Sequence, residues 1–318
     1  MKVCEYIEAT DKPFFSVEIS SPLKTKSVSD IFRIIDCFIE YGPKFINVTY
    51  HQQTPVVKEI DGWKKDIVLQ QRASEVGVCA AIQFKYNIDV VPHLICGGFD
   101  RFETEDAIFD LLFLGIENIL ALRGDPAVRE ALFKPKTLGH SYASELVCQI
   151  VDMANNIYIH KDSPHAPVSF CVGVAGYPEK HSEAQSMNED IKWLKHKVDS
   201  GAKYIVTQMF YDFDKYVSWE RKCRDAGITV PIIPGIKPIT KLKQIDALPE
   251  IFHITVPGNL ADRMRANPRE ARQIGIDYTI ELSKKLLAHG VPAIHYFSMS
   301  SGKDIARVVR EVFSLNAD

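Results

Sequence analysis

The strongest constraint on the fold of this chain is a regular alternation of two kinds of segment along the sequence. A short apolar run suited to one strand is followed by an amphipathic run suited to one helix, and the pair then recurs. This alternation predicts parallel strands, because each helix carries the chain back to the edge where the previous strand began. The expected strands are residues 14–20, 45–49, 89–95, 118–122, 168–175, 204–209, 231–236 and 293–298.

The expected helices follow from apolar side chains spaced three and four residues apart. In the first helix, residues 29–41, the inner stripe contains Ile31, Ile34, Ile35 and Phe38. A polar loop from residue 50 to about 65 is predicted to lead into a helix that ends near residue 84. Ser141 is a candidate N-cap for a helix over residues 141–159. The other expected helices are residues 104–114, 188–200, 214–226, a short one after 240, about 268–288, and 303–315.

Eight strand–helix units in 318 residues predict an α/β fold of the (β/α)8 TIM-barrel type, with residues 1–318 as a single domain. The alternative is an open doubly wound sheet. Sheets of that kind commonly bind nucleotides through a G-x-G-x-x-G or G-x-x-x-x-G-K-[ST] loop after a strand, and neither pattern follows a strand here. No low-complexity linker indicates a second domain, so the barrel is favoured.

Composition excludes several classes of function. A net charge of −3 provides no electrostatic footprint for nucleic acid or for an anionic membrane surface. No apolar run approaches the roughly 18 residues of a membrane span, and the N-terminus lacks a signal-peptide pattern. The seven cysteines are scattered without a C-x-x-C pair. This pattern favours reduced thiols in a cytoplasmic protein and gives no sign of a metal site.

Polar side chains stand at the end of strand after strand, where a barrel places its chemistry. Any one of them is explained equally well as a polar group that caps the sheet, and an isolated Arg-Gly-Asp-Pro is usually a solvated turn. Their recurrence at every strand end favours a mouth that holds a ligand. These residues are Glu18, Thr49, His93, Arg123 with Asp125, Tyr177, Gln208, Lys237 and Ser298.

Glu18 is the most informative of these residues. Period-two alternation places Ser16 and Glu18 on one face of the first strand and Phe15, Val17 and Ile19 on the other. A carboxyl group inside a barrel is desolvated, which would raise its pKa toward the range of a general acid. An ion pair with Lys or Arg of a neighbouring strand explains the residue equally well.

A second candidate is a stripe on the helix over residues 188–200. Asp190, Trp193 and Lys197 stand at positions i, i+3 and i+7, so they share one helix face. The stripe is either a solvated surface or the wall of a site for an elongated polar ligand, and periodicity does not choose between these alternatives.

Several ordered motifs resemble those of methylenetetrahydrofolate reductases, over essentially the whole chain. The matching fragments are F-F-S-V-E at 14–18, N-V-T-Y at 47–50, H-L-I-C at 93–96, A-L-R-G-D-P at 121–126, Y-A-S-E-L-V at 142–147, V-A-G-Y-P-E-K-H-S-E-A at 174–184, K-V-D-S-G-A at 197–202, V-T-Q-M-F at 206–210 and I-I-P-G-I at 232–236. Each fragment is weak alone, and their common order and spacing make the resemblance specific.

The resemblance implies a (β/α)8 barrel with FAD at its C-terminal mouth. It implies reduction of 5,10-methylenetetrahydrofolate to 5-methyltetrahydrofolate, with NADH or NADPH as hydride donor in a ping-pong relay through the flavin, as a source of methyl groups for methionine synthesis. The alternatives are a folate-reducing flavoprotein supplied with electrons by a partner protein, and a non-catalytic flavin- or folate-binding subunit. A symmetric homo-oligomer is common among such enzymes, and the sequence leaves the oligomeric state open.

The resemblance also assigns roles to individual residues. Glu18 resembles the family's general acid, which protonates N10 of the folate. Asp125 resembles the acidic residue that stabilises the iminium cation beside flavin and pterin, and Gln208 resembles a substrate-contacting amide. Arg123 and Lys197 are the natural partners of the FAD pyrophosphate. The positions that resemble FAD-lining residues are Thr49, His93, Leu122, Arg123, Gly124, Asp125, Tyr142, Ala143, Tyr177, His181, Asp190 and Lys197.

The sequence departs from the family pattern in three places. Residues 19–22 read Ile-Ser-Ser-Pro, where a Pro-Pro is common after the catalytic Glu. Ser300 and Ser301 stand where Asn and Arg are usual near the folate. Trp193 and His196 stand where some bacterial members have Asn and Arg facing the FAD. Since the chain ends just after its last barrel helix, the C-terminal regulatory domain of eukaryotic relatives is not expected.

Overall fold

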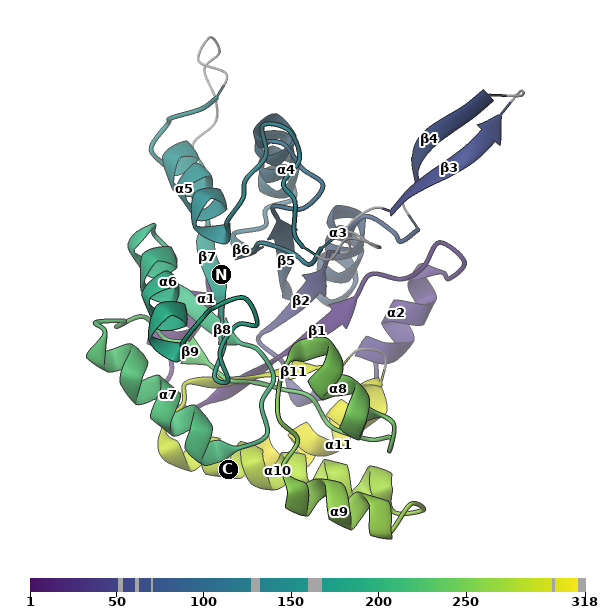
Figure 1. The fold of residues 1–318 in the computed structure, drawn as a ribbon, viewed down its shortest axis with the longest axis vertical. Helices are drawn as coiled ribbons and strands as arrows, with labels where there is room; N and C mark the ends of the chain where they lie inside the picture. The colour runs from purple at the N-terminus through teal and green to yellow at the C-terminus, as the bar shows by residue number, and fades with distance from the viewer. Residues whose placement is uncertain are drawn as a thin grey trace.

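The computed structural model describes residues 1–50, 54–60, 63–69, 71–126, 132–159, 168–298 and 301–313. Its main sheet is a closed ring of parallel strands surrounded by helices (Figure 1). The order around the ring is β1 (Phe14–Ser20), β2 (Phe45–Thr49), β5 (Asp89–Ile95), β6 (Asn118–Leu122), β7 (Cys171–Gly176), β8 (Tyr204–Thr207), the pair β9 (Ile232–Ile233) and β10 (Gly235–Ile236), and β11 (Ala293–Phe297). This arrangement confirms the predicted barrel.

One strand position in the ring is split by a proline. β9 pairs with β8, and β10 pairs with β11, so the two short pieces together join the neighbours on either side. Pro234 lies between them and has no N–H to donate, but its carbonyl accepts the N–H of His295 at 2.9 Å. The parallel pairing of β11 with β1, in register from Ala293 opposite Phe14, closes the barrel.

The helices cover the outside of the ring because each buries one apolar stripe. In α11 (Gly302–Phe313), Ile305, Val308, Val309 and Val312 are buried at spacings of three and four residues. The other helices of the ring are α2 (Val28–Ile35), α3 (Glu75–Tyr86), α4 (Arg101–Phe113), α5 (Ala143–Ala154), α6 (Met187–Asp199), α7 (Phe213–Asp225), α8 (Gln244–Phe252), α9 (Gly258–Ala266) and α10 (Ala271–His289).

The inside of the barrel is apolar at its N-terminal end. Buried side chains that include Phe14, Phe45 and Tyr204 fill this end, and Val3 of a short helix, α1 (Val3–Glu8), packs against them. The N–H of Val3 donates to the side-chain oxygen of Asn118 at 2.8 Å, which fixes α1 across the opening. Gly173 of β7 is required here, because a Cβ at this position would lie 2.3 Å from the ring of Tyr204.

The segment between β2 and α3 differs most from the prediction. A loop to residue 65 and a long helix were expected, but the backbone forms an antiparallel hairpin, β3 (Thr54–Ile60) and β4 (Trp63–Leu69), which projects from the barrel in Figure 1. Helix α3 begins only at Glu75. The signal that was missed is Asp61-Gly62 between two β-branched runs, a dipeptide typical of hairpin turns.

Smaller corrections concern the ends of elements. The first predicted helix ends at Ile35, and a separate 3-10 helix covers Ile39–Tyr41. Ser141 is not the N-cap of α5; Tyr142 takes that position, and the N–H of Ser141 instead donates to the Glu145 carboxylate at 2.7 Å. The strand expected from residue 168 begins at Cys171. Helices α1 and α9 were not predicted.

Candidate active site

A buried polar cluster occupies the inside of the barrel above the apolar end. Alternation along β1 places Phe14, Ser16 and Glu18 inward, while Phe15 and Val17 pack under the surrounding helices. Glu18 is only 9% exposed. Its carboxylate lies 3.6 Å from Nε2 of His93 and 3.7 Å from Nε2 of His295. Two imidazoles are therefore close neighbours of this carboxylate.

Hydrogen bonds hold this cluster in place. The backbone N–H and the hydroxyl of Ser298 both donate to the carbonyl of Glu18, at 3.1 and 2.7 Å. Nδ1 of His295 lies 2.8 Å from the hydroxyl of Ser16, and Nε2 of His93 lies 3.3 Å from the amide nitrogen of Asn47. These contacts fix the strand end and the two imidazoles that face Glu18.

Lys237 adds a cation to the cluster. It follows β10 and is 5% exposed. Burial lowers the pKa of its ammonium to about 8, although the nearby charge of Glu18 opposes that change. A buried lysine and a buried carboxylate therefore share one end of the barrel.

Three polar atoms at this end have no hydrogen-bond partner within the described part of the chain. They are the hydroxyl oxygen of Thr49, the side-chain oxygen of Asn47 and Nε2 of His295, all shielded from solvent. Buried polar atoms are normally satisfied, so a group of unpartnered atoms beside a barrel mouth indicates that a polar ligand completes the site.

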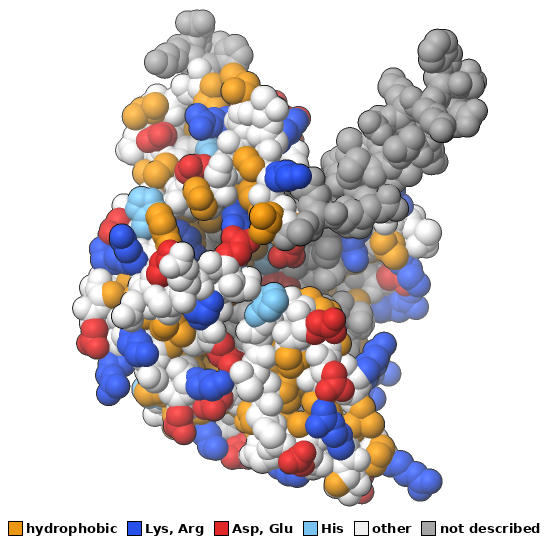
Figure 2. All heavy atoms as spheres, in the orientation of Figure 1, with side chains coloured by type: hydrophobic (Ala, Val, Ile, Leu, Met, Phe, Trp, Pro, Cys, Tyr) orange, Lys and Arg blue, Asp and Glu red, His pale blue; other side chains and the backbone are white. Residues whose placement is uncertain are grey.

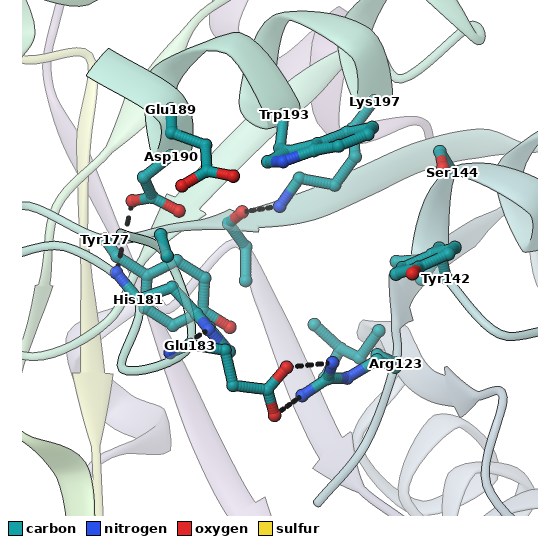
Figure 3. A pocket seen from close by; sticks show the side chains of 15 residues that line it. Arg123, Tyr142, Ser144, Tyr177, His181, Glu183, Glu189, Asp190, Trp193 and Lys197 are labelled. Carbon is teal, nitrogen blue, oxygen red and sulfur yellow. Dashed lines mark hydrogen bonds and ion pairs between the residues drawn. The ribbon is translucent and has the colours of Figure 1, made fainter. Parts of the chain in front are cut away.

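A cavity of about 330 Å³ adjoins this end over β6 and β7, and we call it the β6–β7 cavity (Figure 3). Its walls come from the ends of β6 and β7, the loop after β7, the start of α5 and one face of α6. Eight of the predicted cofactor positions line it, namely Leu122, Arg123, Tyr142, Ala143, Tyr177, His181, Asp190 and Lys197. Residues that the prediction did not include also line it, among them Ser144, Glu183 and Glu189.

Arg123 is held by a carboxylate that the prediction missed. Both terminal nitrogens of its guanidinium donate to Glu183, at 2.6 and 2.7 Å (Figure 3). This bidentate contact raises the pKa of Arg123 and lowers the pKa of Glu183. Glu183 lies 60 residues away in an exposed loop, and only its place in the motif after β7 could have suggested it.

The α6 stripe lines this cavity, with Trp193 at its exposed outer edge. The carboxylate of Asp190 accepts the N–H of His181 at 3.2 Å, and burial raises the pKa of Asp190. The ammonium of Lys197 donates to the carbonyl of Ala175 and lies 5.8 Å from the centre of the Tyr177 ring. Burial lowers the pKa of Lys197 to about 8. Asp190, Trp193 and Lys197 therefore all line the β6–β7 cavity.

Two aromatic rings face each other at the outer edge of the β6–β7 cavity. Tyr142 and Trp193 are parallel within 5°, with ring centres 6.3 Å apart, and more than half of each side chain is exposed (Figure 3). Deeper in the cavity, the rings of Tyr177 and His181 meet edge to face at 4.7 Å. Burial lowers the pKa of His181, which favours a neutral imidazole. The cavity thus combines flat apolar surfaces with a few fixed charges.

The other predicted positions lie outside the β6–β7 cavity. Glu18, Thr49 and His93 belong to the barrel end, as described above. Gly124 has a φ of +87°, and a Cβ there would lie 3.1 Å from the side chain of Ile95, so glycine suits this turn. Asp125 is exposed, and the half-buried Gln208 accepts the N–H of Met209 with its own side-chain oxygen. Ser300 lies outside the described residues.

Three further features bear on the kind of site that this chain can carry. In the described residues, no group of three or more His, Cys, Asp or Glu side chains is arranged to hold a metal ion. The seven cysteines, all of them described, are free thiols. No helix among the described ranges is both long and apolar enough to cross a bilayer.

Comparisons with known proteins agree with this geometry. Residues 2–312 match the family described as methylenetetrahydrofolate reductase. The chain is 31% identical over 306 residues to methylenetetrahydrofolate reductase 1 of Schizosaccharomyces pombe, covering 95% of this chain and 46% of that protein. It is 28% identical over 288 residues to 5,10-methylenetetrahydrofolate reductase of Escherichia coli, covering 90% and 86%. The chain thus spans about half the length of the first curated relatives it matches.

A solved structure shows the same fold. An uncharacterised protein from Clostridium thermocellum, described as binding two copies of 5-methyl-5,6,7,8-tetrahydrofolic acid, superimposes with a TM-score of 0.62 over 98% of both chains. At 12% sequence identity, this likeness supports the barrel architecture alone.

Proposed function

This chain belongs to the methylenetetrahydrofolate reductase family, and we propose that it is itself a flavin-dependent enzyme that reduces 5,10-methylenetetrahydrofolate to 5-methyltetrahydrofolate with NADH or NADPH. The observation that carries the proposal is the presence of two features toward the C-terminal ends of the barrel strands. A buried carboxyl group, Glu18, lies two residues before the end of β1, and the β6–β7 cavity lies over the ends of β6 and β7. We also propose the cytoplasm as its location, on the pattern of scattered free thiols.

The residues at this barrel end fit FAD. The parallel rings of Tyr142 and Trp193 offer a surface for a purine, and Arg123 and Lys197 offer cations for a pyrophosphate. The unpartnered hydroxyl of Thr49 lies among the groups that would face the ring system. A flavin held there supplies the hydride transfer, which no protein side chain can perform.

Charge in the β6–β7 cavity also bears on the fit. Arg123 and Lys197 face three carboxyl groups, those of Glu183, Glu189 and Asp190. Burial raises the pKa of Asp190, while the hydrogen bond from the N–H of His181 and the charge of Lys197 oppose that change. Arg123 must exchange its contact with Glu183 for a phosphate, so Glu183 competes with the ligand. The affinity for the cofactor is therefore expected to depend on the negative charge of Glu183.

Glu18 is proposed to deliver one proton to N10 of the folate, which opens the five-membered ring. The carboxyl group of Glu18 is buried, and Nε2 of His93 and Nε2 of His295 lie 3.6 and 3.7 Å from it. Asp125 is proposed to stabilise the cation that forms when the ring opens. Because Asp125 is exposed, this role requires the bound substrate to cover it. Gln208 is proposed to contact the pterin through its amide.

The visible spectrum of the purified, FAD-reconstituted protein tests this function. We expect flavin bands that bleach anaerobically with NADH or NADPH and return when 5,10-methylenetetrahydrofolate is added, with one 5-methyl product per flavin. Bleaching by dithionite alone, followed by folate reduction, would instead indicate a partner protein as electron donor. Bound flavin without folate reduction would indicate a non-catalytic subunit. A protein that cannot be reconstituted with FAD would refute the proposal.

A further inference from the structure

A second cavity, of about 530 Å³, lies at the rim of the barrel between α2 and α11, and we call it the rim cavity. Ser20 and Ser21 line it from the end of β1, and Ser301 and Gly302 line it from the start of α11. Because both segments follow strand ends, the rim cavity opens at the same end of the barrel as Glu18. None of the residues assigned to the proposed reaction lines it.

The rim cavity is strongly basic. Five cations and a single carboxylate, Asp30, are among its lining residues; the cations are Lys26, Arg33, Arg72, Arg272 and Lys303. Lys and Arg side chains also gather along the edge of the molecule that carries α2 (Figure 2). The β6–β7 cavity has the opposite balance, with two cations and three carboxyl groups. The rim cavity therefore suits a ligand with several negative charges.

Not all of this positive charge is neutralised by the protein. Arg33 pairs with Asp30, and Arg272 pairs with the buried Asp304 at 2.7 Å. Within the described residues, neither Lys26 nor Lys303 forms an ion pair with a carboxylate. Arg72 donates to the carbonyl of Ser21 at 2.5 Å, a contact that leaves its charge uncompensated.

The start of α11 adds a further positive contribution. A Cβ at Gly302 would lie 2.1 Å from the carbonyl oxygen of Ile34, so glycine allows α11 to begin directly against α2. The first-turn N–H groups of a helix have no intrahelical acceptor and carry its positive dipole end. These groups stand beside the cation cluster, where both attract the same anion.

Backbone contacts connect the lining of the rim cavity with the site of the proposed proton transfer. Ser298, which holds the carbonyl of Glu18, also accepts the N–H of Ser301 at 2.9 Å. Ser21 follows Glu18 by three residues, a span of about 10 Å in extended chain. In the folate, N10 is joined through one benzoyl ring to the glutamate carboxylates. A folate with N10 at Glu18 therefore has its carboxylates within reach of this rim.

We propose that the rim cavity binds the oxyanion end of a substrate seated in the barrel mouth. This inference rests on the proposed function. Two substrates carry such a group: the folate, in the carboxylates of a glutamyl tail, and the nicotinamide dinucleotide, in its phosphates. The position beside Glu18 favours the glutamyl tail.

The test compares the wild type with a Lys26→Ala/Lys303→Ala variant, in which both substituted residues are exposed and outside the proposed catalytic machinery. A Lys222→Ala/Lys284→Ala variant removes the same charge from α7 and α10 and serves as the control. Fluorescence titration measures the affinity for 5-methyltetrahydrofolate with one and with five γ-linked glutamates. We expect the variant to bind the pentaglutamate about two- to thirtyfold more weakly than wild type, from the loss of two exposed charge contacts, with the monoglutamate affected less.

A parallel arm distinguishes the sources of the anion. If the variant raises the KM for NADPH but not for NADH, the cavity binds the dinucleotide 2′-phosphate; a loss confined to the pentaglutamate identifies the folate tail. The effect should shrink between 0.1 and 1 M salt, because screening shortens from roughly 10 to roughly 3 Å. Equal affinities in the variant and its control, for every ligand, would overturn the proposal.

Inorganic tripolyphosphate separates this inference from the proposed function. Suppose that the protein binds neither folate nor dinucleotide but binds tripolyphosphate, and that this binding requires Lys26 and Lys303. The rim cavity is then an anion site, and the proposed reaction is wrong. Folate turnover without any dependence on these two lysines leads to the opposite conclusion, in which the reaction stands and the rim site is rejected.

Discussion

The two ends of the barrel interior use the same strands for different purposes. Phe14 and Phe45 lie at the N-terminal end, in an apolar cluster closed by Val3 of α1. Two positions further along the same inward faces, Ser16 and Asn47 replace them, and Glu18 follows. A step of two residues along a strand keeps the side chain on the same face. The inward faces therefore supply an apolar core at the N-terminal end and the polar groups around Glu18 at the other end.

Among the variants, Glu18→Gln at the polar end of the barrel is expected to have the largest effect. We expect folate reduction to fall by about 100- to 10,000-fold, the usual contribution of a general acid, while FAD binding and flavin reduction by NAD(P)H stay within a few fold. Stopped-flow measurement of the two half-reactions checks this. Undiminished folate reduction by the variant would show that Glu18 is not the acid.

The apolar end should respond in the opposite way. Phe45→Ala removes a fully buried ring and should lower the free energy of unfolding by about 3–5 kcal/mol, because it leaves a cavity in a packed core. Urea denaturation measures the change. Phe84→Ala, at a position 94% exposed, is the matched control and should change stability by less than about 0.5 kcal/mol. A similar loss in both variants would contradict the assignment of this end to stability.

A pH titration of ligand affinity sharpens the comparison, since the polar end depends on charge. Burial lowers the pKa of Lys197 to about 8, while Asp190 opposes that change and Arg123 adds to it. A phosphate beside the ammonium favours the protonated form, so the pKa of Lys197 rises on binding. Affinity for ADP should therefore be flat below about pH 8 and fall above it, by at most about tenfold per pH unit. Equilibrium dialysis measures the profile, and Lys197→Met should abolish the fall.

The smallest expected effect concerns Glu183, which holds Arg123 before any ligand arrives. Glu183→Gln removes the competing charge and should tighten the binding of ADP by about two- to fivefold, the scale of a partly exposed ion pair. Arg123→Ala should weaken it instead. Isothermal titration compares the two variants, and a change in the same direction for both would exclude competition between Glu183 and the phosphate.

The sequence predicted the barrel, and the shared strand face of Ser16 and Glu18, because both depend on local periodicity. The α6 stripe was found for the same reason, although only the structure shows which side of it faces a cavity. Glu183 was missed because its contact joins residues far apart in the chain, and such contacts have no local pattern. The β3–β4 hairpin was missed because its many polar residues suggested a loop, and Asp61-Gly62 was not weighed as a turn.

The closure of the N-terminal end of the barrel by α1 affects how a ligand can reach Glu18. Among the described residues, Tyr204 and its buried neighbours fill the barrel axis beneath the polar cluster. A ligand of Glu18 is therefore expected to bind and dissociate through the C-terminal end of the barrel. Two ligands that bind at the same position beside Glu18 would then have to bind in succession.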